Sequence, residues 1–167
     1  YRPFTKQWLY FNRRFNEMVY QMPRIFPDAE AENLVIGVSG TGAMHGFCVL
    51  IGRSLFDMCT VDIRISQCFP LYLYDEAAQS ADDRLFSGQS SDGPRRRDAI
   101  TDAGLAHFQS AYPGEAISKQ DLFYYVYGIL HSPDYRARYA DNLSKELPRI
   151  PRVHTAQDFW HFSRAGR

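Results

Sequence analysis

Residues 118–143, SKQDLFYYVYGILHSPDYRARYADNL, are the stretch that decides the fold. Its apolar side chains recur every three or four residues, which is the period of an α-helix with one buried face. Ser118, followed three residues later by Asp121, is typical of a helix N-cap, and Ser132-Pro133 repeats the signal as a cap and a first helical residue. The stretch therefore predicts two consecutive helices, the second of which ends at Leu147-Pro148.

Further helices are predicted on both sides of this stretch. Ile100, Leu105 and Phe108 have helical spacing and precede a Pro113-Gly114 stop. Thr155, with an acidic residue three positions later, begins a last helix. The chain from residue 99 onward is therefore predicted to be helical.

The first half of the chain has a different pattern. Short runs of β-branched or aromatic residues are separated by Gly, Ser, Asp and Pro, which is typical of an antiparallel meander or a small barrel. The predicted strands are residues 34–39, 47–51, 59–63 and 69–74, with another at 6–11; a helix is predicted at 12–21, ended by the prolines of 22–27.

Residues 75–98 contain few apolar side chains and many Asp, Ser and Gly, so they are predicted to be a variable linker or insertion. The order of strands, polar connection and helices predicts the α+β fold class. We expect a single domain over residues 1–167, with a strand-rich part at 1–74 and a helical part at 99–167.

Charge limits the classes of partner. The 167 residues contain 19 basic and 19 acidic side chains, which argues against nucleic-acid binding through bulk charge alone. Residues 1–27, however, hold five basic residues against one acidic residue, and residues 136–152 hold five against two. These two basic strips fit either a phosphate backbone or a protein partner. No apolar run is long enough to span a membrane.

Catalytic motifs are absent from the sequence. The glycine-rich residues 37–46 lack the lysine of a phosphate-binding loop, and they indicate either a hairpin connection or a loop that approaches a ligand. The five histidines show no metal-ligand spacing, so we expect neither a catalytic nor a metal site. Three cysteines without a CxxC pair indicate buried thiols in a reducing cytoplasm.

Several stretches together resemble the C-terminal specificity domain, or target recognition domain, of Type ISP restriction-modification enzymes. They are YRPF at residues 1–4, WLYF at 8–11, MPRIF at 22–26, FPLY at 69–72 and, above all, YVYGILHSPDYRARYADNLSKELPRIP at 125–151. The resemblance covers nearly the whole chain apart from residues 75–98.

This resemblance implies a fragment of a larger, cytoplasmic prokaryotic polypeptide that also carries a nuclease, a helicase-like ATPase and an N6-adenine methyltransferase. The fragment itself would not be an enzyme and would hold no cofactor, whereas the parent enzyme would use S-adenosylmethionine, ATP and Mg. Its implied role is to bind double-stranded DNA sequence-specifically as a monomer and to present the target adenine to the methyltransferase domain. The alternative is a module that docks on the methyltransferase or helicase domains without reading DNA.

Candidate DNA contacts follow from residue chemistry, since cations bind phosphates and polar loop side chains read base edges. The predicted phosphate contacts are Lys6, Arg13 and Arg14. The predicted base-reading residues are Ser39, Thr41, His45, Arg53, Arg64 and Gln67. Arg149 and Arg152 are predicted to contact either phosphate or the methyltransferase domain.

Overall fold

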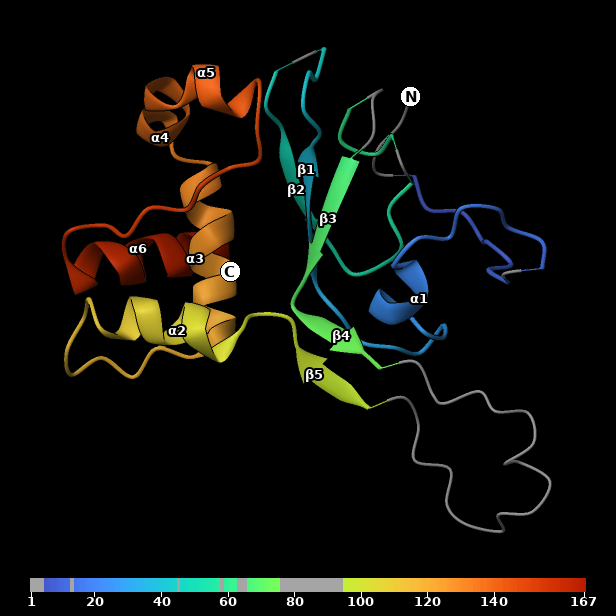
Figure 1. Cartoon of the computed structure of the whole chain (residues 1–167), viewed down its shortest axis with the longest axis horizontal. Coiled ribbons are helices and arrows are strands. Elements are labelled where there is room, and N and C mark those ends of the chain that lie inside the picture. The colour runs from blue at the N-terminus through green and yellow to red at the C-terminus, as the bar shows by residue number, and fades with distance from the viewer. Residues whose placement is uncertain (1–4, 13, 45, 58, 63–65, 76–94) are drawn as a thin grey trace, which may run out of the picture.

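Apart from the short helix α1, the described elements up to residue 98 are strands, and those after it are helices (Figure 1), which confirms the predicted α+β class. The computed structural model describes residues 5–12, 14–44, 46–57, 59–62, 66–75 and 95–167. The strands are β1 (Val35–Ser39), β2 (Val49–Gly52), β3 (Ser66–Pro70), β4 (Tyr72–Tyr74) and β5 (Arg96–Asp98). The helices are α1 (Met22–Ile25), α2 (Asp102–Gln109), α3 (Lys119–Leu130), α4 (Pro133–Arg138), α5 (Ala140–Leu143) and α6 (Ala156–Gly166).

β1 is the central strand of an antiparallel sheet with the order β2-β1-β3. Ile36 pairs with Ile51 of β2 on one side and with Phe69 of β3 on the other. Because β3 pairs with β1 and not with β2, the predicted meander is wrong. β4 and β5 form a separate two-stranded antiparallel ribbon.

The two faces of β1 contribute to two different hydrophobic cores. Ile36 and Val38 belong to the large core that the sheet shares with the helical half. Val35 points to the opposite face and packs with Ile25 and Phe26 around α1. Figure 1 shows α3 and α1 on opposite sides of this sheet, and every residue of β1 is accordingly buried.

Phe56 packs against the sheet at two glycines. Gly52 pairs with Val35, so it shares a sheet face with Gly37 two residues farther along β1. A Cβ atom at either glycine would overlap the Phe56 ring. The glycines are therefore needed at these positions because an aromatic ring lies directly on the backbone.

α3 and α6 form the centre of the helical half, with their backbones in close contact. A Cβ atom at Gly128 of α3, or at Gly166 of α6, would overlap a backbone carbonyl oxygen of the partner helix. This close approach brings Tyr125 and Phe159, both fully buried, into a stacked arrangement with ring centroids 4.7 Å apart.

The helix starts predicted at Ser118, Ser132 and Thr155 are confirmed. Ser118 and Thr155 each accept a hydrogen bond from the backbone N–H three residues later, at 3.1 Å. Ser132-Pro133 begins α4 as predicted. The single helix predicted after Ser132 is instead divided into α4 and α5, because Tyr139 leaves the helical conformation with φ −111° and ψ 19°.

Three tyrosine hydroxyls attach residues 149–153 to the helical half. We call these side chains the tyrosine ladder, because they donate to every second carbonyl of an extended segment. The bonds are Tyr135 to Arg149 at 2.9 Å, Tyr125 to Pro151 at 2.6 Å and Tyr112 to Val153 at 2.7 Å.

Residues 6–21 differ from prediction over their described part, since they form neither a strand nor a helix. A strand needs a pairing partner, and none of the described strands pairs with residues 6–11. Met18 and Tyr20 have positive φ angles of 55° and 48°, which a right-handed helix cannot contain. The helix begins later, at Met22 of α1, where Pro23 lies in the first turn and helps to start the element that it was predicted to end.

Residues 59–62, predicted as the start of a strand, form turns and bends; position 63 lies outside the described residues. The Asp57 side chain accepts a hydrogen bond from the Cys59 N–H at 2.8 Å, which stabilises a turn locally. The predicted strand 69–74 is divided at Leu71 between β3 and β4.

The polar stretch 75–98 is not a linker throughout, because its last residues form β5 against β4. Residues 76–94 lie outside the described part of the chain, so the prediction of an insertion there is not tested. The cysteines, predicted to be buried, are half-buried; burial raises the pKa of the Cys68 thiol to about 11. Within the described residues, no helix is both long and apolar enough to cross a membrane.

Candidate nucleic-acid interface

Predicted base-reading residues gather at one end of the three-stranded sheet, which we call the loop end. Ser39 pairs with Ser66 at this end, and Gln67 pairs with Val38. Thr41 follows β1 in the connection to β2 and is exposed, whereas Gln67 is half-buried. The backbone N–H of Gly42 donates to the Ser144 carbonyl at 3.1 Å, which attaches this connection to the end of α5.

Ser39 has a structural role at the loop end. Its side chain is buried, with 5% exposed, and its hydroxyl accepts a hydrogen bond from the Cys48 N–H at 3.0 Å. The Ser39 N–H donates in return to the Cys48 carbonyl at 2.9 Å. Ser39 therefore closes the β1–β2 hairpin and leaves Thr41 and Gln67 as the more accessible polar groups.

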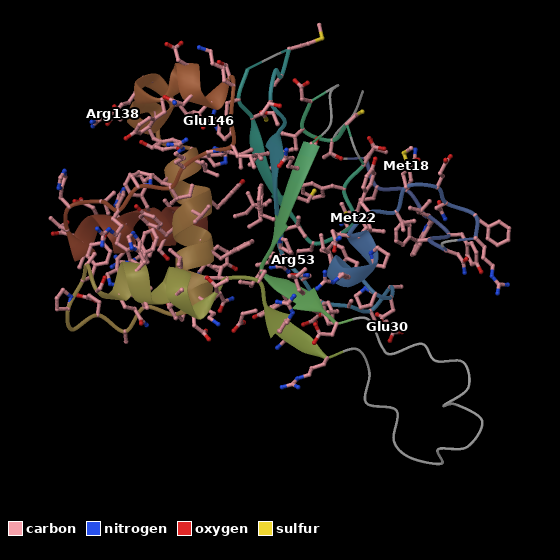
Figure 2. All side chains as sticks on the ribbon, viewed as in Figure 1. Met18, Met22, Glu30, Arg53, Arg138 and Glu146 are labelled. Atoms are coloured by element: carbon pink, nitrogen blue, oxygen red, sulfur yellow. The ribbon has the colours of Figure 1, made fainter. Side chains whose placement is uncertain are left out.

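The structure separates Arg53 from the other candidates. Arg53 follows Gly52, which pairs with Val35 at the start of β1, so Arg53 lies at the opposite end of the sheet. Figure 2 labels its side chain at that end. His45 and Arg64 lie outside the described residues. Sequence proximity to a strand end did not reveal which end of the sheet each residue occupies.

The predicted phosphate contacts belong to an exposed, irregular segment at the start of the chain. Lys6 and Arg14 are exposed, and Arg13 lies outside the described residues. The Arg14 N–H donates to the Asn12 side chain at 2.8 Å, and the Asn16 side chain donates to the Tyr10 carbonyl at 2.9 Å. These bonds form a local turn and leave the basic side chains in solvent.

The same segment exposes large apolar side chains, a feature that sequence reasoning missed. Trp8 is fully exposed, at 103% of its reference area. Contiguous exposed apolar groups of this size usually mark a contact surface. We call the set the N-terminal apolar patch: Trp8, Leu9, Tyr10, Phe15, Met18 and Tyr20.

Arg149 and Arg152 are exposed at the edge of the helical half. Arg149 forms an ion pair with Glu146 at 2.9 Å, and Arg152 donates to the His107 carbonyl at 3.3 Å. The pKa of the Glu146 carboxyl is lowered by its hydrogen bond from Asn142 and by the Arg149 guanidinium. Both arginines therefore already have protein partners.

Three arginines at the end of the polar stretch 75–98 occupy a defined position. Arg95, Arg96 and Arg97 run into β5 and are all exposed. The Arg96 guanidinium lies 4.3 Å from the centre of the Tyr72 ring, and Arg97 forms an ion pair with Asp75 at 3.1 Å. The run of three basic residues before a predicted helix was the signal for this site.

We looked for metal-binding side chains in the part of the chain that the structure describes. There, no group of three or more His, Cys, Asp or Glu side chains is arranged to bind a metal ion. The chemistry that the described surface offers is charge, hydrogen bonding and aromatic contact.

Known proteins resemble the chain in both sequence and fold. The family model for the Type ISP C-terminal specificity domain matches residues 1–167. The structure of a DrdV–DNA complex is 37% identical with a TM-score of 0.77 over 95% of this chain. A nuclease-deletion mutant of the Type ISP restriction-modification enzyme LlaGI, in complex with a DNA substrate mimic, is 36% identical with a TM-score of 0.70 over 98% of this chain.

A third solved structure is the ATP-dependent Type ISP restriction-modification enzyme LlaBIII bound to DNA. It is 26% identical, with a TM-score of 0.74 over 95% of this chain. The chain spans only 14%, 12% and 9% of the lengths of these three solved chains, respectively. No curated protein matches the chain significantly.

Proposed function

Because the chain belongs to the Type ISP C-terminal specificity domain family, we propose that it binds double-stranded DNA and recognises the target sequence of a restriction-modification enzyme. The observation that carries this proposal is the family match over all 167 residues. The DNA complexes of DrdV, LlaGI and LlaBIII support it, since each includes a region with this fold.

Base reading is proposed at the loop end. Thr41 and Gln67 carry hydrogen-bonding groups on a sheet whose two faces are packed, and such a support holds a reading side chain in position. His45 and Arg64 remain proposed readers on their chemistry alone. A well-placed bidentate contact to a base edge discriminates by about 1–3 kcal/mol.

Phosphate contacts are proposed for Lys6, Arg13 and Arg14. The described members are exposed, which leaves their charge available to a partner. Such contacts set the position of the protein on the duplex and make binding sensitive to salt, without reading sequence.

The intact enzyme would supply the chemistry. We propose that the chain is a non-catalytic part of a larger polypeptide with nuclease, helicase-like ATPase and N6-adenine methyltransferase domains, and that it presents the target adenine to the methyltransferase. S-adenosylmethionine, ATP and Mg would be bound by those other domains. A prokaryotic cytoplasmic location and a monomeric fragment fit this role.

The proposal is tested by titrating the 167-residue chain with a randomised duplex pool at low and moderate salt and by sequencing the retained DNA. Enrichment of an asymmetric motif, with affinity that falls as salt rises, is the expected result. Binding that stays indifferent to sequence at every salt concentration would contradict sequence recognition by this chain.

A second candidate function is docking on the methyltransferase domain, favoured by the N-terminal apolar patch. Trp8 and Tyr10 are exposed aromatic residues of the kind that dominates protein interfaces. A Trp8→Ser/Tyr10→Ser variant should then weaken association with the remainder of the enzyme and leave the DNA affinity of the fragment unchanged. A Lys6→Gln variant is the matched control, with the opposite expected pattern.

A further inference from the structure

The surface at the end of the sheet opposite the loop end is rich in arginine. We call Arg95, Arg96 and Arg97 the arginine strip: Arg96 and Arg97 lie on the exposed strand β5, and Arg95 directly precedes it. Arg53 lies at the same end of the molecule. The predictions for DNA contact assigned nothing to the strip and placed Arg53 among the base readers.

Strand register places the strip and Arg53 near one another. Gly52, next to Arg53, pairs with Val35 on one side of β1. On the other side of the chain just before β1, the Leu71 N–H donates to the Leu34 carbonyl, and the Asn33 side chain bonds both to the Tyr72 N–H and to the Tyr72 carbonyl. Arg53 and Tyr72 are thus about two strand spacings apart, roughly 10 Å.

Arg96 is held in place before any ligand arrives. Its guanidinium lies 4.3 Å from the centre of the Tyr72 ring, and the Tyr72 backbone is fixed by hydrogen bonds of 3.1 and 2.9 Å to Asn33. Asn33 is itself buried, so the support for the ring is rigid. Holding an arginine in position reduces the entropy lost when it binds an anion.

Not every arginine at this end of the molecule is neutralised by a carboxylate among the described residues. Asp75 is paired with Arg97 at 3.1 Å, and Asp98 is paired with Lys119 at 3.1 Å. Among the described residues, Arg53, Arg95 and Arg96 have no carboxylate partner. Three exposed guanidinium groups therefore remain for an external anion, and guanidinium binds phosphate well in both charge and shape.

The two ends of the sheet are separated by the length of about six base pairs of duplex DNA. Asn33 and Ser39 are six residues apart in extended chain, which corresponds to about 20 Å. A duplex carries one base pair per 3.4 Å of axis, so this span covers about six base pairs. A duplex that lies along the strand direction would reach both ends of the sheet.

We propose that Arg53, Arg95 and Arg96 form a second contact with DNA phosphates, about six base pairs from the bases read at the loop end. This inference rests on the proposed function. It changes the role of Arg53 from base reading to phosphate binding. Arg97 would not contact phosphate, because it is already paired with Asp75.

Salt dependence tests the charge contact. The fragment and its Arg95→Gln/Arg96→Gln variant are titrated with the selected duplex between 50 and 200 mM salt. Loss of two phosphate contacts should make the slope of log affinity against log salt about two units shallower, with unchanged sequence preference. The control is Arg164→Gln, which removes one exposed positive charge from α6 outside both basic strips. It should keep the original slope.

Duplex length tests the geometry. Base pairs are removed one at a time from each side of the recognised sequence. The unmodified fragment should lose affinity once one flank becomes shorter than about six base pairs, whereas Arg95→Gln/Arg96→Gln should be insensitive to that flank. An Arg95→Lys/Arg96→Lys variant should recover most of the slope and of the flank dependence, since lysine also binds phosphate.

The outcomes separate the two proposals. If the unmodified fragment recognises a sequence and the Gln variant keeps its slope and flank dependence, the phosphate contact is overturned while the proposed function stands. If the unmodified fragment does not bind DNA, the proposed function itself fails. The Arg95→Gln/Arg96→Gln variant could aggregate, because charges on an edge strand such as β5 also prevent pairing with other molecules. In that case the salt dependence of the Arg53→Gln variant tests the phosphate contact. A slope about one unit shallower supports the proposal, and an unchanged slope rejects it.

Discussion

Asn33 is the buried polar side chain that joins α1, β1 and β4. Its amide nitrogen donates to the Ile25 and Tyr72 carbonyls, both at 2.9 Å. Its amide oxygen accepts from the backbone N–H groups of Leu34 at 2.9 Å and Tyr72 at 3.1 Å. Every hydrogen-bonding group of the amide is thus satisfied, so the residue stabilises the sheet despite its burial.

Replacing Asn33 with Ala should lower the free energy of unfolding by about 3 kcal/mol. The substitution leaves several backbone groups without a partner in a buried site, and each such group costs about 1–3 kcal/mol. Urea unfolding followed by circular dichroism measures the loss.

Two further variants show whether hydrogen bonding is the cause. Asn33→Asp retains the size but replaces the donor with a second acceptor that faces two carbonyls, so it should also destabilise strongly. Asn142→Ala removes an exposed amide that bonds only to Glu146, and it should change stability by less than about 0.5 kcal/mol. Equal effects at positions 33 and 142 would contradict the role of Asn33.

At the scale of elements, the helical half depends on the contact between α3 and α6. Gly128→Ala should destabilise the protein by about 1–3 kcal/mol, because the added methyl group overlaps a carbonyl of α6. Intrinsic helix propensity alone would make alanine more stabilising than glycine by up to about 1 kcal/mol. A loss of stability in Gly128→Ala would therefore have to come from the overlap with α6. Thermal unfolding measures the difference.

Gly104→Ala is the matched control on α2. A Cβ atom there meets mainly the Thr101 hydroxyl, at 3.2 Å, and no backbone of another helix. It should cost less than Gly128→Ala. A stabilising effect of Gly128→Ala would show that the two helices separate easily.

Because of the tyrosine ladder, the free energy of unfolding should depend on pH in the alkaline range. Burial raises the pKa of Tyr112, Tyr125 and Tyr135 above that of a solvated phenol, which is about 10. Above pH 10 the unfolded chain therefore loses these protons while the native chain retains them. The free energy of unfolding should be constant with respect to these groups below pH 9 and fall as pH rises beyond 10.

Urea unfolding at pH 8 to 11 measures this decline. Tyr125→Phe removes one buried phenol, so its stability should fall less steeply above pH 10 than that of the unmodified chain. It should also cost about 1 kcal/mol at neutral pH through the lost bond to Pro151. An unchanged alkaline slope in this variant would exclude Tyr125 as a contributor.

At the scale of the whole molecule, DNA affinity and DNA specificity should separate by position. Gln67→Ala should relax the preference at one base pair by about 1–3 kcal/mol and leave the other positions of the motif unchanged. Lys6→Gln should weaken binding to all sequences equally and reduce the salt dependence by about one unit. Sequencing of duplexes retained by each variant checks both results. Loss of specificity in Lys6→Gln would contradict the division of roles.

The candidate interface was only partly accessible to sequence reasoning. Thr41 and Gln67 lie at the loop end, although Gln67 was predicted in a strand connection and belongs to β3. Burial of Ser39 and the position of Arg53 depend on pairing between distant strands, which residue type does not indicate. The arginine strip was missed because the sequence of β5 has no strand pattern of its own, and the strand forms by pairing with β4.

The sequence by itself determined the α+β class, the starts of α3, α4 and α6 and the position of the central strand. These features depend on residues within about four positions of one another, as in the cap that Ser118 forms with Asp121. Only the tertiary structure decided that β3 returns to β1, that residues 6–21 stay irregular and that Arg53 lies opposite the loop end. Each of these depends on which distant segments come into contact, because a strand needs a partner and burial needs a neighbour.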